Sequence, residues 1–298
     1  MIVRGGPRAL SSPQAMRDFV FLQSRPKAPL SCHVESLWYA RGTVPYRRER
    51  VLPNGRVVLL INLGDPLRQE GTETGNFLGR ETWISGLQSR YTINEPLGET
   101  HVAGVTFRPT GATAFFAPPM AEFSDRLTPL DAVWGAAARC LRERIGAAAG
   151  PAGVLASLEA ALLERLRPEA GGLAALRYVL ARLDSPEPPP LRALCGALDC
   201  SHKHLIARFR RSVGLPPKAL ARIVRFNRLL HAIEPRGRVR WERLAQDCGY
   251  YDQAHFNRDF RAFAGLTPSR YLAERRLAFG AALAAGENPQ FVPYSDTA

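Results

Sequence analysis

Three side chains near the C-terminus are of the types that read the edges of DNA bases. Gln253, Asn257 and Arg258 stand on the polar side of a segment in which Phe256 and Phe260 recur one helical turn apart. Asn and Gln pair bidentately with adenine, and Arg pairs in the same way with guanine. The segment is therefore predicted to be an amphipathic helix whose polar face enters the major groove of a DNA duplex.

A second, shorter helix has to hold this segment in place. Residues 241–248 repeat apolar side chains at i, i+3, i+4 and i+7, and Gly249 follows where the chain must turn sharply. Asp252 is placed to cap the next helix, Gly265 to end it and Pro268 to stop any continuation. Two short helices joined at a glycine predict a helix-turn-helix.

Residues 241–272 resemble the C-terminal signature of AraC/XylS-type transcription regulators. The signature has an Ala in the first helix, Gly-aromatic at the turn, then Phe-x-Arg-x-Phe-Arg and Gly-x-Thr-Pro-x-x-Tyr. In this chain these are Ala245, Gly249-Tyr250, 256–261 and 265–271. The resemblance implies a C-terminal DNA-binding domain that contains two helix-turn-helix units.

An imperfect copy of the pattern lies upstream. Leu205, Phe209 and Gly214 repeat the spacing of the second unit, and Ser201 is placed to cap the corresponding helix. Asp199 holds the turn position where the family usually has Gly, and Asp tolerates the left-handed conformation better than most residues. Such a doubled unit is expected to read two successive major-groove segments on one face of the duplex.

The predicted DNA contacts come from both recognition helices. The first offers few amides, so direct base readout and plain phosphate contact remain alternatives for it. The second carries the base-reading groups. The full set is His202, Lys203, Ile206, Ala207, Arg210, Gln253, Ala254, His255, Asn257, Arg258 and Arg261.

The charge of the chain favours a polyanionic partner. The 298 residues carry a formal net charge of +13, and 173–280 hold about twenty Lys and Arg against about nine Asp and Glu. A concentrated basic field favours DNA and makes binding strongly salt-dependent, with a solvated basic surface as the alternative. No apolar run approaches the ~20 residues of a membrane span, and the N-terminus lacks the apolar region of a signal peptide. A cytoplasmic, nucleoid-associated protein is expected.

The N-terminal part has a different pattern, of short runs at strand period broken by turn residues. This pattern predicts a small β-barrel or sandwich. Segments 50–65 and 104–109 resemble a cupin-like N-terminal domain found in a subgroup of these regulators. The expected elements are a short helix around 13–22, strands at 33–40, 56–62, 82–86, 91–94 and 100–107, and a short helix at 112–116.

A barrel interior is a natural small-molecule pocket, so an effector of unknown identity is an expected partner. For each candidate contact, ordinary core or turn packing is the alternative. The polar and aromatic candidates are Trp38, Tyr39, Arg56, Asn62, Trp83, His101 and Arg108.

Two further helices, around 130–145 and 154–167, are expected between the domains. Their leucine stripe either packs against the N-terminal domain or forms a surface for a homodimer. The predicted chain is an α+β multidomain protein with an all-α C-terminal part. Its parts are a cupin-like β-barrel sensing domain at 1–128, a helical connector at 129–170, the DNA-binding domain at 171–280, with helices at 173–183 and 218–233, and a flexible tail at 281–298.

An enzymatic cupin is the rival from another class. It would need a His-x-His pair with further His and Glu ligands, whereas the N-terminal domain has only His33 and His101. The five cysteines are scattered without a C-x-x-C pair and are expected to be reduced, mostly buried thiols. We therefore expect a regulator that is not an enzyme and that has no cofactor or metal. Its expected partners are double-stranded DNA, the effector and the transcription machinery.

Overall fold

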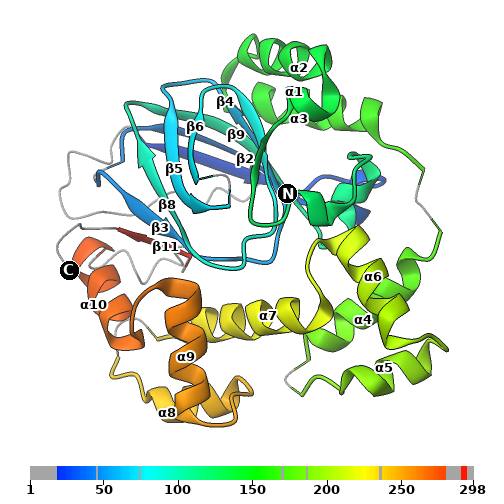
Figure 1. Cartoon of the computed structure of the whole chain (residues 1–298). Helices are drawn as coiled ribbons and strands as arrows, with labels where there is room; N and C mark the ends of the chain where they lie inside the picture. The colour runs from blue at the N-terminus through cyan, green and yellow to red at the C-terminus, as the bar shows by residue number, and fades with distance from the viewer. Residues whose placement is uncertain are drawn as a thin grey trace.

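The structure of the chain is a computed structural model that describes residues 19–44, 46–73, 75–168, 171–185, 187–234, 237–279 and 290–293. Its N-terminal part holds two β-sheets, and its C-terminal part is helical (Figure 1). The buried apolar side chains form one continuous core that runs from the sheets into the helices. The expected β-rich domain followed by an all-α domain is confirmed.

The first sheet has six strands in the order β1-β2-β9-β4-β7-β10, all paired antiparallel. Its strands are β1 (Val20–Ser24), β2 (Val34–Gly42), β4 (Val58–Asn62), β7 (Thr82–Ser85), β9 (Thr100–Phe107) and β10 (Leu127–Pro129). The central strands are rich in buried Val, Leu and Ile, which pack well on a pleated surface.

The second sheet has five strands in the order β11-β3-β8-β5-β6, also antiparallel. They are β3 (Glu49–Val51), β5 (Leu67–Thr72), β6 (Gly75–Gly79), β8 (Thr92–Pro96) and β11 (Phe291–Pro293). No ladder joins the two sheets in the part of the chain that the structure describes. The barrel expectation is therefore corrected to a pair of facing sheets.

Two predictions of local structure are wrong. The helix expected around 13–22 is replaced over its last residues by β1, because Val20 and Phe21 pair with β2; residues 13–18 lie outside the described range. The tail expected to be flexible contains β11, because Val292 is fully buried where the strand pairs with β3. The five predicted strands are found, each within about two residues of its predicted bounds.

The connector helices are α1 (Asp131–Trp134), α2 (Ala136–Gly146) and α3 (Gly150–Arg165), preceded by the 3₁₀ turns η1 (Leu30–Cys32), η2 (Gly111–Ala114) and η3 (Met120–Glu122). Gly135 divides the helix expected at 130–145, because its φ of 56° and ψ of −139° are open essentially to glycine. Leu155, Leu158 and Leu162 are buried where α3 packs on β1 and β2. These three leucines of the stripe therefore pack inside the chain, whereas Leu163 is exposed, and the homodimer alternative stays untested.

Seven further helices lie between α3 and β11 in the described residues. They are α4 (Leu173–Leu183), α5 (Leu191–Ala197), α6 (His202–Val213), α7 (Pro217–Ala232), α8 (Trp241–Asp247), α9 (Gln253–Ala264) and α10 (Pro268–Phe279). Helix α9 ends before Gly265, as predicted, and Pro268 begins the separate helix α10, in the position where a missing N–H costs nothing. In Figure 1, α7 runs beneath the sheets and joins the unit of α8, α9 and α10 to that of α4, α5 and α6.

Candidate nucleic-acid interface

Helix α9 is held in place by aromatic side chains. Phe256, Phe260 and Phe263 are buried on its inner face. The Phe260 ring lies 5.4 Å from Phe226 of α7 and 5.4 Å from Tyr271 of α10, centroid to centroid. Edge-to-face packing of this kind stabilises the fold beyond what burial of the rings alone contributes. The inner face of α9 is therefore committed to the fold, and the outer face is left for a partner.

The predicted caps and turns of both units are present. The Asp252 carboxylate accepts a hydrogen bond from the His255 amide at 2.6 Å, and the Ser201 hydroxyl accepts one from the amide of His204, the third residue of α6, at 3.2 Å. Gly249 and Asp199 have φ of 82° and 46°. These are left-handed values, so Asp199 keeps the turn that the family makes with Gly. Both turns are set by local hydrogen bonds, which explains why they could be predicted.

The eleven predicted DNA contacts lie on the outward faces of α6 and α9. Ile206, His255 and Asn257 are partly exposed, and the others are exposed. These side chains are therefore accessible to a partner, with His255 the exception described next. Contact with DNA itself stays a prediction.

His255 packs at the edge of α9 rather than standing free. Its Nε2 lies 3.6 Å from Oδ2 of Asp259, and its ring centroid lies 5.3 Å from that of Tyr250. Asp259 is buried and accepts a hydrogen bond from Nη2 of Arg222 at 2.6 Å. This carboxylate ties α9 to α7, so it sets the orientation of the recognition helix. The signal for it in the sequence is an acid placed among the Phe residues of the inner face.

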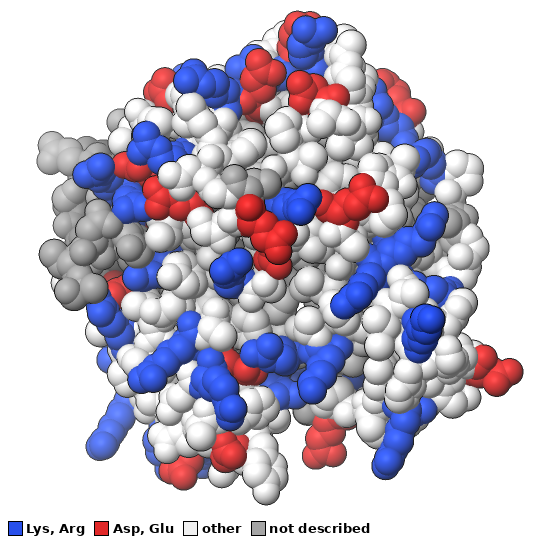
Figure 2. Space-filling model, in the orientation of Figure 1, with Lys and Arg blue, Asp and Glu red and all other residues white. Residues whose placement is uncertain are grey.

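Basic side chains gather over the helical part of the surface. Figure 2 shows Lys and Arg crowding the lower half of the view, over the C-terminal helices, whereas both signs alternate above. The prediction named none of the exposed arginines beside the recognition helices, which include Arg192, Arg211, Arg240 and Arg243. The sequence indicated these arginines only collectively, through the excess of positive charge counted over residues 173–280.

The predicted ligand residues do not gather at one site. Gly104 pairs with Trp38 on one side and with Leu60 on the other, and Leu60 pairs with Trp83, so these residues share one face of the six-stranded sheet. The Trp83 ring centroid lies 5.7 Å from that of Phe77 in the facing sheet. Trp38 and Trp83 therefore point into the space between the two sheets.

Tyr39 and His101 lie on the opposite face, which the connector helices cover. The Tyr39 hydroxyl and His101 Nε2 are 3.1 Å apart. Burial, and then the charge of Arg41, lowers the pKa of His101 below its ordinary value. This pair is separated from the two tryptophans by the sheet itself.

The remaining three candidates have structural partners. Asn62 is buried and donates through Nδ2 to the carbonyl of Asp65 at 2.8 Å, which closes the turn after β4, and to that of Gly79 in β6 at 3.0 Å. Arg56 forms an ion pair with Glu35. Arg108 is exposed, and its Nε donates to the carbonyl of Ser31 at 2.8 Å. For these residues the geometry favours the packing alternative.

The facing sheet places a polar row opposite the tryptophans. Glu49 pairs with Asn94, which pairs with Gln69, which pairs with Phe77, so the row shares the inner face. Burial raises the pKa of Glu49 to about 7, although hydrogen bonds from Tyr46 and Asn94 oppose that effect. Sequence analysis missed this row, because a charged residue in a short run gives no sign of being buried.

One indole in this space lacks a partner. Trp83 is 1% exposed, and its Nε1 finds no hydrogen-bond acceptor among the described residues. A buried N–H without an acceptor costs free energy comparable to a lost hydrogen bond. The inner face therefore offers an unmet donor beside a row of amide and carboxyl groups.

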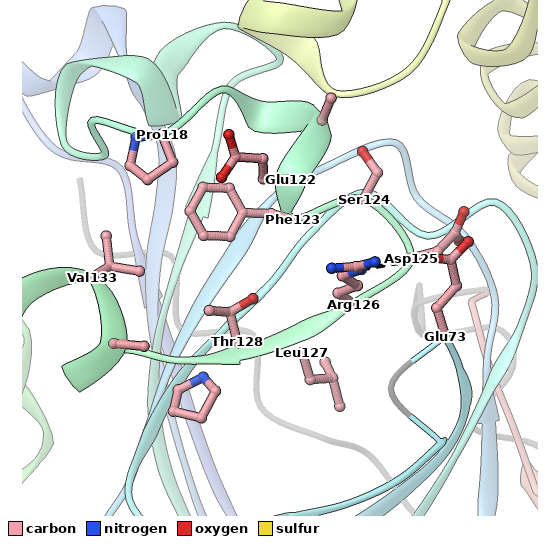
Figure 3. A pocket seen from close by; sticks show the side chains of 13 residues that line it. Glu73, Pro118, Glu122, Phe123, Ser124, Asp125, Arg126, Leu127, Thr128 and Val133 are labelled. Atoms are coloured by element: carbon pink, nitrogen blue, oxygen red, sulfur yellow. Dashed lines mark ion pairs between the residues drawn. The ribbon is translucent and has the colours of Figure 1, made fainter.

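A pocket of about 650 Å³ lies at another place, where η3 and β10 approach α1 (Figure 3). Glu122, Phe123 and Asp125 line it beside Arg126, which lies 3.5 Å from a carboxylate oxygen of Glu73. None of the predicted ligand residues belongs to it. The position of the pocket is notable because η3, which lines it, also contacts the recognition helix α6.

The N-terminal domain rests on the end of both recognition helices. A Cβ on Gly214, the C-cap of α6, would stand 2.7 Å from the Ser124 hydroxyl, and one on Gly265, the C-cap of α9, would stand 2.4 Å from the Tyr91 ring. Real Cβ atoms do not approach other atoms so closely. Each helix therefore ends in a glycine that lets the N-terminal domain touch it.

A third contact ties β3 to the helices. Nη1 of Arg50 lies 3.0 Å from Oε2 of Glu274 in α10, with both side chains mostly buried. Asn227 of α7 donates to the carbonyl of Pro53 at 3.1 Å and accepts from Gln290 at 2.9 Å. The connecting helix, the end of β3 and the strand β11 therefore meet at one junction.

The described residues contain no group of three or more His, Cys, Asp and Glu that could hold a metal ion. They also include no helix with the length and hydropathy that crossing a membrane requires. All five cysteines are free, but Cys32 and Cys140 are exposed and Cys200 is partly so. The expectation of mostly buried thiols is therefore wrong: only Cys195 and Cys248 pack inside helix-turn-helix cores.

Two family models match parts of the chain. Residues 194–274 match a helix-turn-helix domain, and residues 22–129 match a domain of unknown function, DUF6597. No curated protein sequence matches the chain.

Several solved structures show a distant likeness. A structure of ToxT from Vibrio cholerae is 10% identical, covers 86% of this chain and 98% of its own, and gives a TM-score of 0.45. A second structure of ToxT, with an unsaturated fatty acid bound, is also 10% identical, with coverage of 91% and 99% and a TM-score of 0.45. The AraC-like transcriptional activator CuxR is 12% identical, with coverage of 72% and 87% and a TM-score of 0.23.

Proposed function

Since residues 194–274 are a helix-turn-helix domain of the AraC type, we propose that the chain is a transcription regulator that reads duplex DNA through α6 and α9. The observation that carries the proposal is the division of α9 into two faces. Phe256, Phe260 and Phe263 are buried, whereas Gln253 and Arg258 are exposed on the outer side. A helix fixed on one side that presents amide and guanidinium groups on the other suits the major groove.

The two recognition helices are proposed to do different work. The exposed face of α9 carries groups that pair with base edges. The exposed face of α6 offers Lys203 and Arg210 beside Ala207, a set suited to phosphate and to occasional methyl contacts. The second unit therefore carries most of the sequence preference, and the first adds affinity.

Arg258→Ala is expected to relax the preference at one or two positions of the operator and to leave non-specific affinity nearly intact. A bidentate contact to guanine contributes ~1–3 kcal/mol at its own base position. Selection of binding sites from a random duplex pool, run in parallel on the wild type and the variant, measures the change.

Lys203→Ala is the matched control on α6. It is expected to weaken all sequences alike and to flatten the dependence of log K on log salt by about one unit, because one fewer counterion is released. The motif should not change. If Lys203→Ala alters the motif and Arg258→Ala does not, the assignment of the two helices is reversed.

The proposed function as a whole is tested by titrating the full chain against a pool of genomic fragments. Enrichment of a discrete motif supports a regulator, and uniform binding to all fragments would leave an architectural, non-specific role. The genes that flank the coding sequence then indicate which promoters to test.

We propose further that a small effector binds between the two sheets. The supporting observations are the unmet Nε1–H of Trp83 and the inner row that contains Glu49, Asn94 and Gln69. A ligand suited to these groups carries an acceptor for the indole and donors for the amide and carboxyl oxygens. It also needs a flat apolar part to lie against the tryptophans.

The route from that space to the DNA-binding part would be β3. Glu49 faces inward, and the next residue, Arg50, faces outward and pairs with Glu274 of α10. Glu49 and Arg50 point to opposite faces of one strand, so we expect a ligand that moves the β3 backbone at Glu49 to shift Arg50 as well. The second helix-turn-helix unit is therefore one residue away from the proposed effector site.

Trp83→Phe is expected to abolish or weaken effector binding, because phenylalanine keeps an aromatic ring and lacks the N–H donor. Thermal-shift screening of a small-molecule library against the wild type would identify compounds, and each would then be titrated into the variant. Arg108→Ala, on an exposed side chain, serves as the control that should bind as the wild type does. Promoter occupancy that is identical under every growth condition would contradict sensing altogether.

The leucine stripe of α3 offers a homodimer little surface, because Leu155, Leu158 and Leu162 are buried within the chain, whereas Leu163 is exposed. The regulator would act on the chromosome together with the transcription machinery, and we propose no catalytic role for it. Sedimentation of the free and DNA-bound protein tests the dimer.

A further inference from the structure

The two helix-turn-helix units differ by one residue in the turn. Between α5 and α6 the turn is 198–201, whereas between α8 and α9 it is 248–252. The backbone closes both turns in the same way, by Cys200 N to Cys195 O at 3.1 Å and by Tyr250 N to Ala245 O at 2.9 Å. After these equivalent bonds the first unit reaches its cap at once, and the second inserts Tyr251 before it.

The inserted residue takes no part in the packing of the domain. Tyr251 is 90% exposed, while its neighbour Tyr250 is 4% exposed and lies against Phe256. A tyrosine so exposed adds almost nothing to the free energy of folding through burial. Tyrosine does, however, provide an apolar ring with a hydroxyl at its tip, the combination that is enriched at binding interfaces.

The position of Tyr251 is next to the DNA-reading end of α9. Recognition helices contact base edges with their N-terminal residues, so the residue before the cap comes closest to the backbone beside the groove. Asp252 cannot take that place, because its carboxylate accepts the His255 amide at 2.6 Å and its charge repels phosphate. Gln253 already belongs to the face directed at the bases. Tyr251 is therefore the residue placed to contact the DNA backbone.

We propose that Tyr251 binds the sugar-phosphate backbone beside the base pairs read by α9, with its hydroxyl donating to a phosphate oxygen and its ring lying against the sugar. This inference rests on the proposed DNA-binding function. Phosphate contacts carry no sequence information and fix the register of the protein on the duplex. Tyr251 is thus a positioning contact for the second unit that the first unit lacks.

The test measures DNA affinity of the full chain at several salt concentrations, on the selected operator and on an unrelated duplex. Tyr251→Ala is expected to weaken both about tenfold, the loss typical of a hydrogen bond to a charged group. Tyr251→Phe should show most of that loss, because it removes the hydroxyl alone. The salt slope should stay unchanged in both, since a neutral side chain releases no counterion, in contrast to Lys203→Ala.

Two controls isolate the contact from folding. Thermal unfolding of Tyr251→Ala should match the wild type, because the side chain is 90% exposed. Tyr178→Ala, which removes a tyrosine that is 39% exposed on α4, should bind DNA as the wild type does.

The possible results distinguish failure of the Tyr251 contact from failure of the proposed DNA-binding function. A wild type without sequence preference would remove the proposed function itself. A wild type that selects a motif while Tyr251→Ala binds equally well would overturn the tyrosine contact alone. A changed base preference in Tyr251→Ala, with non-specific affinity retained, would also overturn it, because the ring would then read a base and not the backbone.

Discussion

Phe260→Ala is expected to lower the free energy of unfolding of the C-terminal domain by about 3–5 kcal/mol. The side chain is fully buried, and the rings of Phe226, Phe256 and Tyr271 lie 5.4, 5.7 and 5.4 Å from its own. Phe226 belongs to α7 and Tyr271 to α10, so the cavity would loosen the recognition helix from both supports. Denaturant unfolding followed by far-UV circular dichroism measures the loss, and operator affinity should fall with it.

Phe209→Ala is the matched control in the first unit. Phe209 is equally buried and holds the corresponding position of α6. Aromatic pairs add about 0.5–1.5 kcal/mol each beyond burial, and the described contacts include none for Phe209. The loss for Phe209→Ala should therefore be the smaller of the two. Equal losses would show that the ring cluster around Phe260 adds nothing special to the second unit.

Glu49→Gln is expected to stabilise the protein at pH 8 by about 3 kcal/mol more than it does at pH 4.5. Burial raises the pKa of Glu49 to about 7, against 4.5 in the unfolded chain. Between these values the folded state keeps a proton that the unfolded state has released, so unfolding becomes easier as pH rises. The stability contributed by neutral Glu49 is thus fully present below pH 4.5 and is lost as pH rises through 7. The difference between 7 and 4.5 converts to about 3 kcal/mol.

Gln cannot ionise, so the variant should lack this pH dependence. Denaturant unfolding of both proteins at pH 4.5, 6 and 8 measures it. Glu122→Gln, which changes an exposed carboxyl on η3, is the control and should leave the pH dependence of the wild type in place. A difference between Glu49→Gln and the wild type that is the same at all three pH values would contradict the burial of an ionisable group at this position.

The helix-turn-helix units follow from the sequence because their determinants are local. Ser201 and Asp252 cap the helices that they precede, and Asp199 takes the left-handed conformation expected of it. The Phe spacing of α9 specifies its buried face in the same way. Each of these features depends on residues within a few positions of one another, so pattern and chemistry suffice to predict it.

The outward placement of the candidate DNA contacts follows from the same periodicity. Once Phe256 and Phe260 define the inner face, the geometry of a helix directs Gln253 and Arg258 outward. Helical periodicity does not predict how deeply the His255 side chain packs. That depth depends on the buried Asp259 and on Arg222, which reaches it from another helix.

The N-terminal domain depended far more on its tertiary structure. Strand β5 alternates polar side chains on both faces, so it carries no apolar signal, and β11 consists of three residues in a stretch that reads as a tail. Both strands exist because a partner strand completes their backbone hydrogen bonds. A partner more than two hundred residues away, as for β11 and β3, leaves no trace in the local pattern.

The effector site proposed between the sheets is likewise a product of register. Trp38 and Trp83 were identifiable as aromatic candidates, but pairing across β9 and β4 places them on one face and sends Tyr39 to the other. Glu49 joins them because β3 turns that residue inward and Arg50 outward. A shift of the strand register by one residue would exchange these faces, and only the packing of the two sheets selects one register. The sequence by itself therefore determined the helix-turn-helix units, whereas the fold decided which side chains face the proposed effector site and which hold the helices.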